Sequence, residues 1–98
     1  MPAPDTTTAS SWTLPVRLRP GDDVRRALEH AIARENIAAA FVLSGIGSLR
    51  PAMLRLAGAP DNTRIDADTE VLTLSGTLGA AGTSRTSHLH MSVADDQG

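Results

Sequence analysis

The chain has 98 residues, a mass of 10.2 kDa and a formal net charge of −2 at pH 7, enough for one domain and no more. Its nine basic residues are all arginines and are outnumbered by eleven acidic ones, so the chain lacks the clustered basic charge and high pI of an autonomous nucleic-acid binder. Cysteine is absent, which excludes disulfides and thiolate metal sites, and no apolar run reaches membrane-spanning length.

The N-terminal residues predict a tail and then a strand. Residues 1–12 are rich in Pro, Thr, Ser and Ala, so we expect a disordered tail there and a single domain over residues 13–98. No charged segment followed by an apolar run precedes this domain, so a cytoplasmic protein without a membrane partner is expected. Thr13–Arg19 alternates apolar and polar residues, which predicts a half-buried strand, and Pro15 favours a position at a sheet edge.

A helix is predicted from about Asp23 to Glu35. Asp23 is a suitable N-cap because a carboxylate accepts hydrogen bonds from the first turn and suits the helix dipole. Asn36 is suited to a left-handed stop. His30 lies off the apolar stripe and is expected to face solvent. The apolar stripe consists of Val24, Ala27, Leu28, Ala31 and Ile32, and the polar face consists of Arg25, Arg26, Glu29, His30 and Arg34.

The rest of the sequence predicts strands separated by turns. Ile37–Leu43 is an unbroken apolar run and predicts a buried strand, which the glycines of Ser44–Ser48 then break. Leu49–Ala57 predicts a further strand, and the Pro, Asp and Asn of Ala59–Asn62 predict a turn.

Two longer strands close the chain. Glu70–Leu78 alternates and predicts a strand with Val71, Thr73, Ser75 and Thr77 on one side. Gly79–Ser84 predicts a hairpin tip, and Ser87–Val93 predicts the return strand, with His88, His90 and Ser92 sharing one face. Asp95–Gly98 is typical of a tight turn with a left-handed glycine, so we expect the last edge of the sheet to be incomplete and open to pairing with another chain.

Several of these segments, in this order, resemble the plants and prokaryotes conserved (PPC) domain family. The resemblance runs from about Leu18 to Gly98. The segments that carry it are Arg19–Val24 with Ala27 and Leu28, Val42–Leu49, Leu54–Arg55 with Ala57–Gly58, Glu70–Leu78, and His88–Asp95 followed by Gly98.

The resemblance implies an α+β fold, a largely antiparallel sheet flanked by one main helix, related in fold to acetolactate decarboxylase. It also implies a homo-oligomer, a trimer in bacterial members, and a DNA-binding, transcription-associated role. Two features of the family are missing between Met1 and Gly98. These are the Arg-Gly-Arg-Pro AT-hook of plant relatives and a later strand with a Gly-Gly-His motif, so we expect the domain to lack its last strand or strands.

His88 and His90 are the residues with metal-site spacing. Residues two apart on a strand point the same way, so both imidazoles can reach one ion. From spacing alone, surface histidines on a half-exposed strand are the commoner explanation. The resemblance implies zinc, held by this pair and a third histidine in the later strand. The alternative function is therefore binding of zinc or a small ligand, with a metal-dependent lyase or hydrolase as a further possibility.

Two other sets of residues are candidate ligand contacts. Ser44, Gly45 and Gly47 expose backbone N–H groups that suit an anion or small ligand, although a tight turn after a strand explains them as well. Arg50 and Arg55 are candidate anion contacts, with solvated strand charges as the alternative. No arrangement of nucleophile and base can be argued, so the sequence favours a binding protein over an enzyme.

Overall fold

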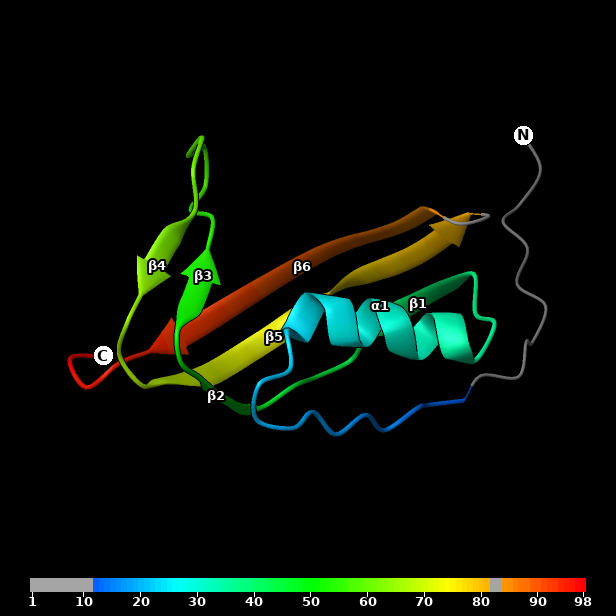
Figure 1. The fold of residues 1–98 in the computed structure, drawn as a ribbon, viewed down its shortest axis with the longest axis horizontal. Helices are drawn as coiled ribbons and strands as arrows, with labels where there is room; N and C mark the ends of the chain where they lie inside the picture. The colour runs from blue at the N-terminus through cyan, green and yellow to red at the C-terminus, as the bar shows by residue number, and fades with distance from the viewer. Residues whose placement is uncertain (1–11, 82–83) are drawn as a thin grey trace, which may run out of the picture.

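The computed structural model describes residues 12–81 and 84–98, which form one helix against an antiparallel sheet (Figure 1). The helix, α1, spans Val24–Arg34. The strands are β1 Ala39–Val42, β2 Gly47–Leu49, β3 Ala52–Leu54, β4 Thr63–Ile65, β5 Thr69–Ala81 and β6 Ser84–Ala94. The α+β class is therefore confirmed. Apart from Trp12, the tail predicted for residues 1–12 lies outside the described residues. In the part of the chain that is described, no helix is long and apolar enough to cross a membrane.

The helix begins and ends at the residues that its sequence indicates. The Asp23 carboxylate accepts a hydrogen bond from the backbone N–H of Arg26 at 3.0 Å, so Asp23 is the N-cap. Asn36 has a φ of 55°, the left-handed conformation that stops a helix. Ala31 and Ile32 of the apolar stripe are buried. Capping and apolar periodicity thus account for α1 without reference to the rest of the chain.

Strand β5 is the centre of the main sheet. It pairs with β6 along nearly its whole length on one edge and with β1 and β2 on the other edge, always antiparallel. The register places Thr77 opposite both Phe41 and His88. Strands β3 and β4 form a separate two-stranded sheet, which projects from the main sheet in Figure 1.

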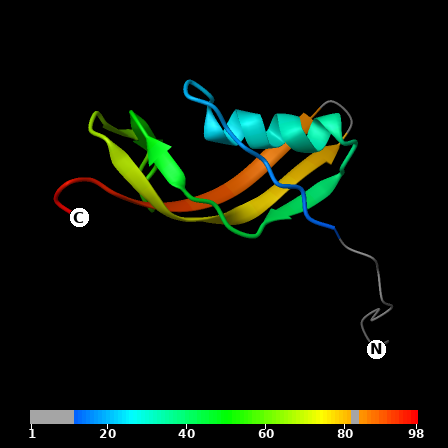
Figure 2. The ribbon, with the colours of Figure 1, turned by 90° about the horizontal axis from the view of Figure 1, so that it is seen from below.

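Helix α1 covers one face of the main sheet, and no described element covers the other face (Figure 2). A hydrogen bond of 2.9 Å from the Ser87 hydroxyl to the Glu29 carboxylate joins the helix to β6. The described core is small: its buried apolar residues are Ala31, Ile32, Ala52, Val71 and Leu78, and no side chain is less than 2% exposed. One side of this sheet is therefore left open to solvent.

The strand predicted for Thr13–Arg19 is wrong. These residues form no strand, and Leu14 and Val16, expected to be half-buried, are exposed. Alternation favours an extended backbone, but a strand also needs hydrogen bonds from a neighbour, and Pro15 has no N–H to donate. The alternation of apolar and polar residues does not show whether a neighbouring strand is present to pair with this segment.

The predictions for the middle of the chain are corrected in two places. Leu49–Ala57 is not one strand: β2 ends at Leu49 and β3 begins at Ala52, with Pro51, which cannot donate a ladder hydrogen bond, between them. The predicted turn at Ala59–Asn62 is confirmed as part of the link from β3 to β4, a strand that the sequence pattern did not reveal. Strand β1 exists but is not buried, since Phe41 is 62% exposed.

The two long strands are confirmed, with one correction to the faces of β5. A bulge between Val71 and Thr73 shifts the register, so Val71 is buried although Thr73 is exposed. The alternation pattern had placed both on one side. Strand β5 continues to Ala81 and β6 starts at Ser84, so the loop is shorter than predicted, and its residues 82–83 lie outside the described residues.

Candidate functional site

His88 and His90 lie together on the face of the sheet that α1 leaves uncovered. Ser87 faces the helix through its hydrogen bond with Glu29, so the residues on either side of it in β6 face the opposite way. The two imidazole rings are adjacent, with centroids 4.9 Å apart and planes tilted by 57°, and both residues are exposed. The prediction that the pair shares one side of the strand is confirmed.

The neighbours of the histidines define a polar surface with an aromatic residue at its β1 end. The register pairs Thr77 with His88 and Ser75 with His90, and Phe41 lies opposite Thr77 on the other side of β5. We call this surface the outer sheet face; it consists of Phe41, Thr73, Ser75, Thr77, His88, His90 and Ser92. These residues carry hydroxyl and imidazole groups that can form hydrogen bonds, and Glu70, exposed next to the buried Val71, adds a carboxylate further along β5.

The outer sheet face of one chain provides too few ligands for a zinc site. Structural zinc sites in proteins use four ligands, and catalytic sites use three with a water molecule. Two imidazoles provide suitable nitrogen donors, but no cluster of three or more His, Cys, Asp or Glu residues capable of holding a metal ion occurs within residues 12–81 and 84–98. Further ligands must come from another molecule or from other parts of the protein if a metal binds here.

The glycine loop has a packing role that the sequence did not show. A Cβ placed on Gly45 would lie 2.7 Å from Cδ2 of Leu74, so the loop lies closely over β5. Gly47 has a φ of 150° at the start of β2, a conformation that favours glycine, and has open space around it. Ser44 is exposed. Close packing on Leu74 accounts for the glycine at position 45, and the ligand-binding role of the loop stays a prediction.

The two predicted anion contacts differ in their surroundings. Arg50 forms an exposed ion pair of 2.9 Å with Asp68, so an anionic ligand at Arg50 would also lie near a carboxylate. Arg55 follows β3 and is exposed. The neighbouring Arg64 pairs in the same way with Asp66 at 2.7 Å. The ion pairs therefore neutralise much of the positive charge around β2, β3 and β4.

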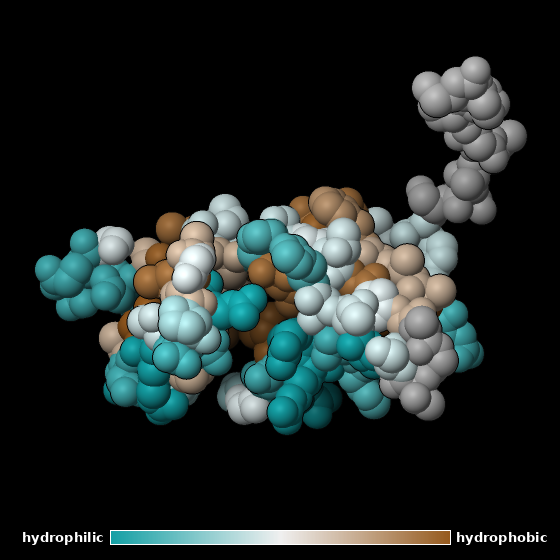
Figure 3. All heavy atoms as spheres, turned by 90° about the horizontal axis from the view of Figure 1, so that it is seen from above, coloured by the Kyte–Doolittle hydropathy of each residue, from teal (hydrophilic) through white to brown (hydrophobic). Residues whose placement is uncertain are grey.

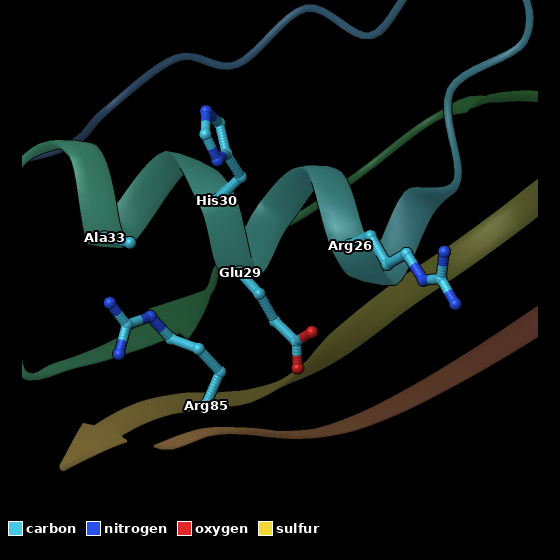
Figure 4. A pocket seen from close by; sticks show the side chains of 5 residues that line it. All are labelled: Arg26, Glu29, His30, Ala33 and Arg85. Atoms are coloured by element: carbon cyan, nitrogen blue, oxygen red, sulfur yellow. The ribbon is translucent and has the colours of Figure 1, made fainter. Parts of the chain in front are cut away.

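A groove between α1 and the start of β6 was not predicted. Its helix wall consists of Arg26, Glu29, His30 and Ala33, which follow the i, i+3, i+4, i+7 spacing of one helical face, and its strand wall is Arg85 (Figure 4). Its volume is about 370 Å³. We call it the helix–strand groove. The helical stripe is visible in the sequence, but nothing local reveals that Arg85 lies across from it.

A smaller hollow adjoins this groove and shares two of its residues. It has a volume of about 180 Å³ and is lined by Ala33, Asn36, Ile37, Ala38, Ala80 and Arg85. Because Ala33 and Arg85 line both spaces, the groove continues along the helix beyond its C-terminal end.

Comparison with known proteins identifies the chain's relatives. The model of the Plants and Prokaryotes Conserved (PCC) domain matches residues 6–98. A protein named Bifunctional protein GlmU from Synechococcus sp. (strain JA-3-3Ab) is 42% identical over 91 residues, covering 93% of this chain and 14% of that protein. Its namesake from Synechococcus sp. (strain JA-2-3B'a(2-13)) is 42% identical over 84 residues, covering 86% of this chain and 13% of that protein. The chain thus spans about one seventh of the length of these relatives. No solved structure matches it.

Proposed function

This chain belongs to the Plants and Prokaryotes Conserved (PCC) domain family, and on that premise we propose that it is a DNA-binding module that acts as an oligomer. The resemblance described above associates the family with DNA and with trimers. The two GlmU relatives carry the matching segment within a much longer chain. The proposal therefore concerns the module itself, as an element that binds and assembles.

Assembly is supported by Phe41, a large hydrophobic residue that is 62% exposed on the outer sheet face. Figure 3, which views the molecule edge-on to the main sheet, shows hydrophobic residues open to solvent in a hollow between hydrophilic ones, apart from the outer sheet face. The hydroxyl and imidazole groups of the outer sheet face can pair with those of another copy through hydrogen bonds. We propose a second copy of this chain as its occupant. The other large exposed hydrophobic residues are outside the outer sheet face as defined and are not assigned to this contact; they are Trp12, Leu14, Val16, Leu43, Ile46, Met53, Leu56 and Leu72.

The observation that carries the DNA-binding part is the position of the arginines. Arg50 and Arg64 are neutralised by aspartates near β2 and β4. Arg25, Arg26 and Arg34, by contrast, are exposed on α1. Guanidinium groups on one exposed helix are suited to phosphate oxygens of a DNA backbone, and an oligomer multiplies such contacts. A local basic surface of this kind is compatible with a net charge of −2 for the whole chain.

Binding to duplex DNA is expected to weaken steeply with salt. Each phosphate contact contributes roughly −0.9 to the slope of log affinity against log salt concentration, so the Arg25→Ala/Arg34→Ala double variant should lower the magnitude of the slope by up to about 2. Fluorescence anisotropy with a random-sequence duplex at several salt concentrations measures this slope. Arg50→Ala, which removes an arginine already paired with Asp68, is the matched control and should leave it unchanged. Undetectable binding or a salt-independent affinity would refute the DNA-binding role.

Zinc binding is a second candidate function, favoured by the 4.9 Å separation of the His88 and His90 rings. In an oligomer joined through the outer sheet face, a second copy would provide further imidazoles. His88→Ala is expected to weaken zinc binding by about tenfold or more, since one of few ligands is lost. Competition with a zinc-sensitive dye measures this affinity. His30→Ala removes a histidine on α1 and serves as the control; equal effects of the two variants would end the zinc hypothesis.

A further inference from the structure

We propose that the far edge of β6, the side turned away from β5, binds Thr13–Arg19 of a second copy as an added strand. We call Thr13–Arg19 the N-terminal segment. This pairing rests on the oligomer proposed above, because a neighbouring copy in the assembly supplies the segment. The main sheet of one copy, which has four strands, would gain a fifth from the next copy.

Strand β6 has a long edge to which no described strand is paired. It spans Ser84–Ala94, 11 residues, and pairs with β5 on one side only. Edge strands are usually protected from further pairing by short length, charged residues, proline or a bulge. β6 has one charged residue, Arg85, and no proline, and the extra residue of the bulge belongs to β5. It therefore offers a long row of backbone groups to a further strand, whereas the edge at β1 is four residues long.

The N-terminal segment has the sequence pattern of a strand but no partner in its own chain. Leu14, Val16 and Leu18 alternate with polar residues and with Pro15. No hydrogen bond joins residues 13–18 to another described residue. In Figure 1 the segment (blue) and β6 (orange) lie on opposite sides of the molecule. A second copy is therefore the source of the strand that we assign to β6.

The hydrogen bonds of β6 show which of its residues would bind an added strand. The backbone N–H of Ser92 donates to the Thr73 hydroxyl of β5 at 3.1 Å, so it points toward β5. Because alternate residues of a strand point their backbone groups to opposite sides, Leu89 and Met91 point theirs toward the far edge. Their side chains face α1, as that of Ser87 does. The far edge thus combines outward backbone groups with side chains on the helix side of the sheet.

Antiparallel addition of the N-terminal segment matches this arrangement. In an antiparallel pair, residues that exchange hydrogen bonds lie opposite each other, with their side chains on the same face of the sheet. Leu14, Val16 and Leu18 would therefore bond to β6 and turn their side chains to the helix side. Pro15 would point its backbone away from β6, where its missing N–H breaks no ladder hydrogen bond. The apolar row and the proline fit the same orientation of the strand.

The surface beside β6 provides an apolar contact for this row of side chains. Figure 3 views the molecule from the side on which β6 lies in Figure 1, and the hydrophobic hollow opens on that side. Leu14 and Val16 are 38% and 41% exposed in the single chain, so contact with the hollow would remove apolar surface from water. Apolar burial and backbone hydrogen bonds would act together, as they do in other cases of strand addition.

The N-terminal segment is too short to hold two copies together by itself. Ordering seven residues offsets most of the free energy that their contacts provide. Within an oligomer, however, the segment is kept near the far edge at a high effective concentration, so the pairing becomes favourable. A variant that breaks the contact through the outer sheet face should therefore lose the pairing at β6 as well.

Amide hydrogen exchange in the full chain, at a concentration where the oligomer forms, tests the proposal. The Met91 amide should exchange slowly in the parent protein. It should exchange about tenfold faster in Val16→Pro, which lacks an N–H that points toward β6 and so loses one hydrogen bond. Arg17→Pro introduces the same ring where the N–H points away, and should leave the exchange of Met91 unchanged. The His90 amide, which points toward β5, should exchange equally in all three proteins.

A synthetic peptide of residues 12–19 tests whether a second molecule can supply the strand. Added in excess to Val16→Pro, it should restore slow exchange of the Met91 amide, whereas the same peptide methylated at the backbone nitrogen of Val16 should not. The strand addition is overturned if Val16→Pro and Arg17→Pro exchange equally at Met91, or if both peptides or neither of them protect it. Sedimentation tests the oligomer separately, so an assembly of full mass without these effects would refute the pairing at β6 alone.

Discussion

Replacing Gly76 by alanine is expected to lower the free energy of unfolding by about 3 kcal/mol or more. Gly76 lies in the middle of β5, paired with Val42 of β1 on one side and with Leu89 of β6 on the other. A Cβ at this position would collide with the carbonyl oxygen of His88 and would lie 2.8 Å from Cα of Leu89. These are backbone atoms, so no side-chain rotation can relieve the collision.

The backbone conformation of Gly76 adds to this cost. Its φ of 142° is one that residues with a side chain rarely adopt. Because β5 is the central strand of the sheet, displacement of β6 would disturb the longest strand pairing in the fold and move His88 away from Thr77. Urea denaturation, followed by circular dichroism at a fixed protein concentration, measures the loss of stability.

Gly58→Ala is the control, because it introduces a side chain at a positive φ without a steric collision. Gly58 also has a positive φ, of 73°, but a Cβ there meets nothing within 4 Å. Its substitution should cost only about 1–2 kcal/mol, the strain of a left-handed residue. If Gly76→Ala and Gly58→Ala lower the free energy of unfolding equally, the predicted collision between a side chain at position 76 and the backbone of β6 does not occur.

If the chain assembles through the outer sheet face as proposed, the Phe41→Asp variant is expected to be a single chain of about 10.2 kDa. Phe41 is 62% exposed in the single chain, so an aspartate there should cost the isolated fold little. On the outer sheet face of an oligomer, however, the same aspartate would place an unpaired charge in the contact between copies, where burial is costly. Sedimentation equilibrium at several protein concentrations measures the mass of each variant.

Leu56→Asp is the matched control for this experiment. Leu56 is exposed to a similar degree, 58%, but lies after β3, away from the main sheet. It introduces the same charge in place of a large apolar residue, so it should leave the mass of the assembly unchanged. A parent protein that sediments as a single chain, or a Phe41→Asp variant that keeps its full mass, would refute the proposed contact through the outer sheet face.

The groove and the strand pairings illustrate what a sequence pattern cannot supply. Arg26 and Arg85 line one groove because β6 passes beside α1, and no local pattern specifies which strand lies there. Thr13–Arg19 shows the same limit, since its alternation was clear but no described strand pairs with it. The bulge after Val71 likewise depends on how β5 aligns with β6 rather than on either strand alone.

The features determined by sequence alone are those that depend on neighbours along the chain. Asp23 and Asn36 bound the helix through groups within one turn of it, and alternation in β6 places His88 and His90 on one face. The tertiary structure decided the position of β5 between β6 and the β1–β2 edge, the groove between α1 and β6, and the exposure of Phe41. Those features depend on contacts between residues far apart in sequence, which periodicity and capping do not encode.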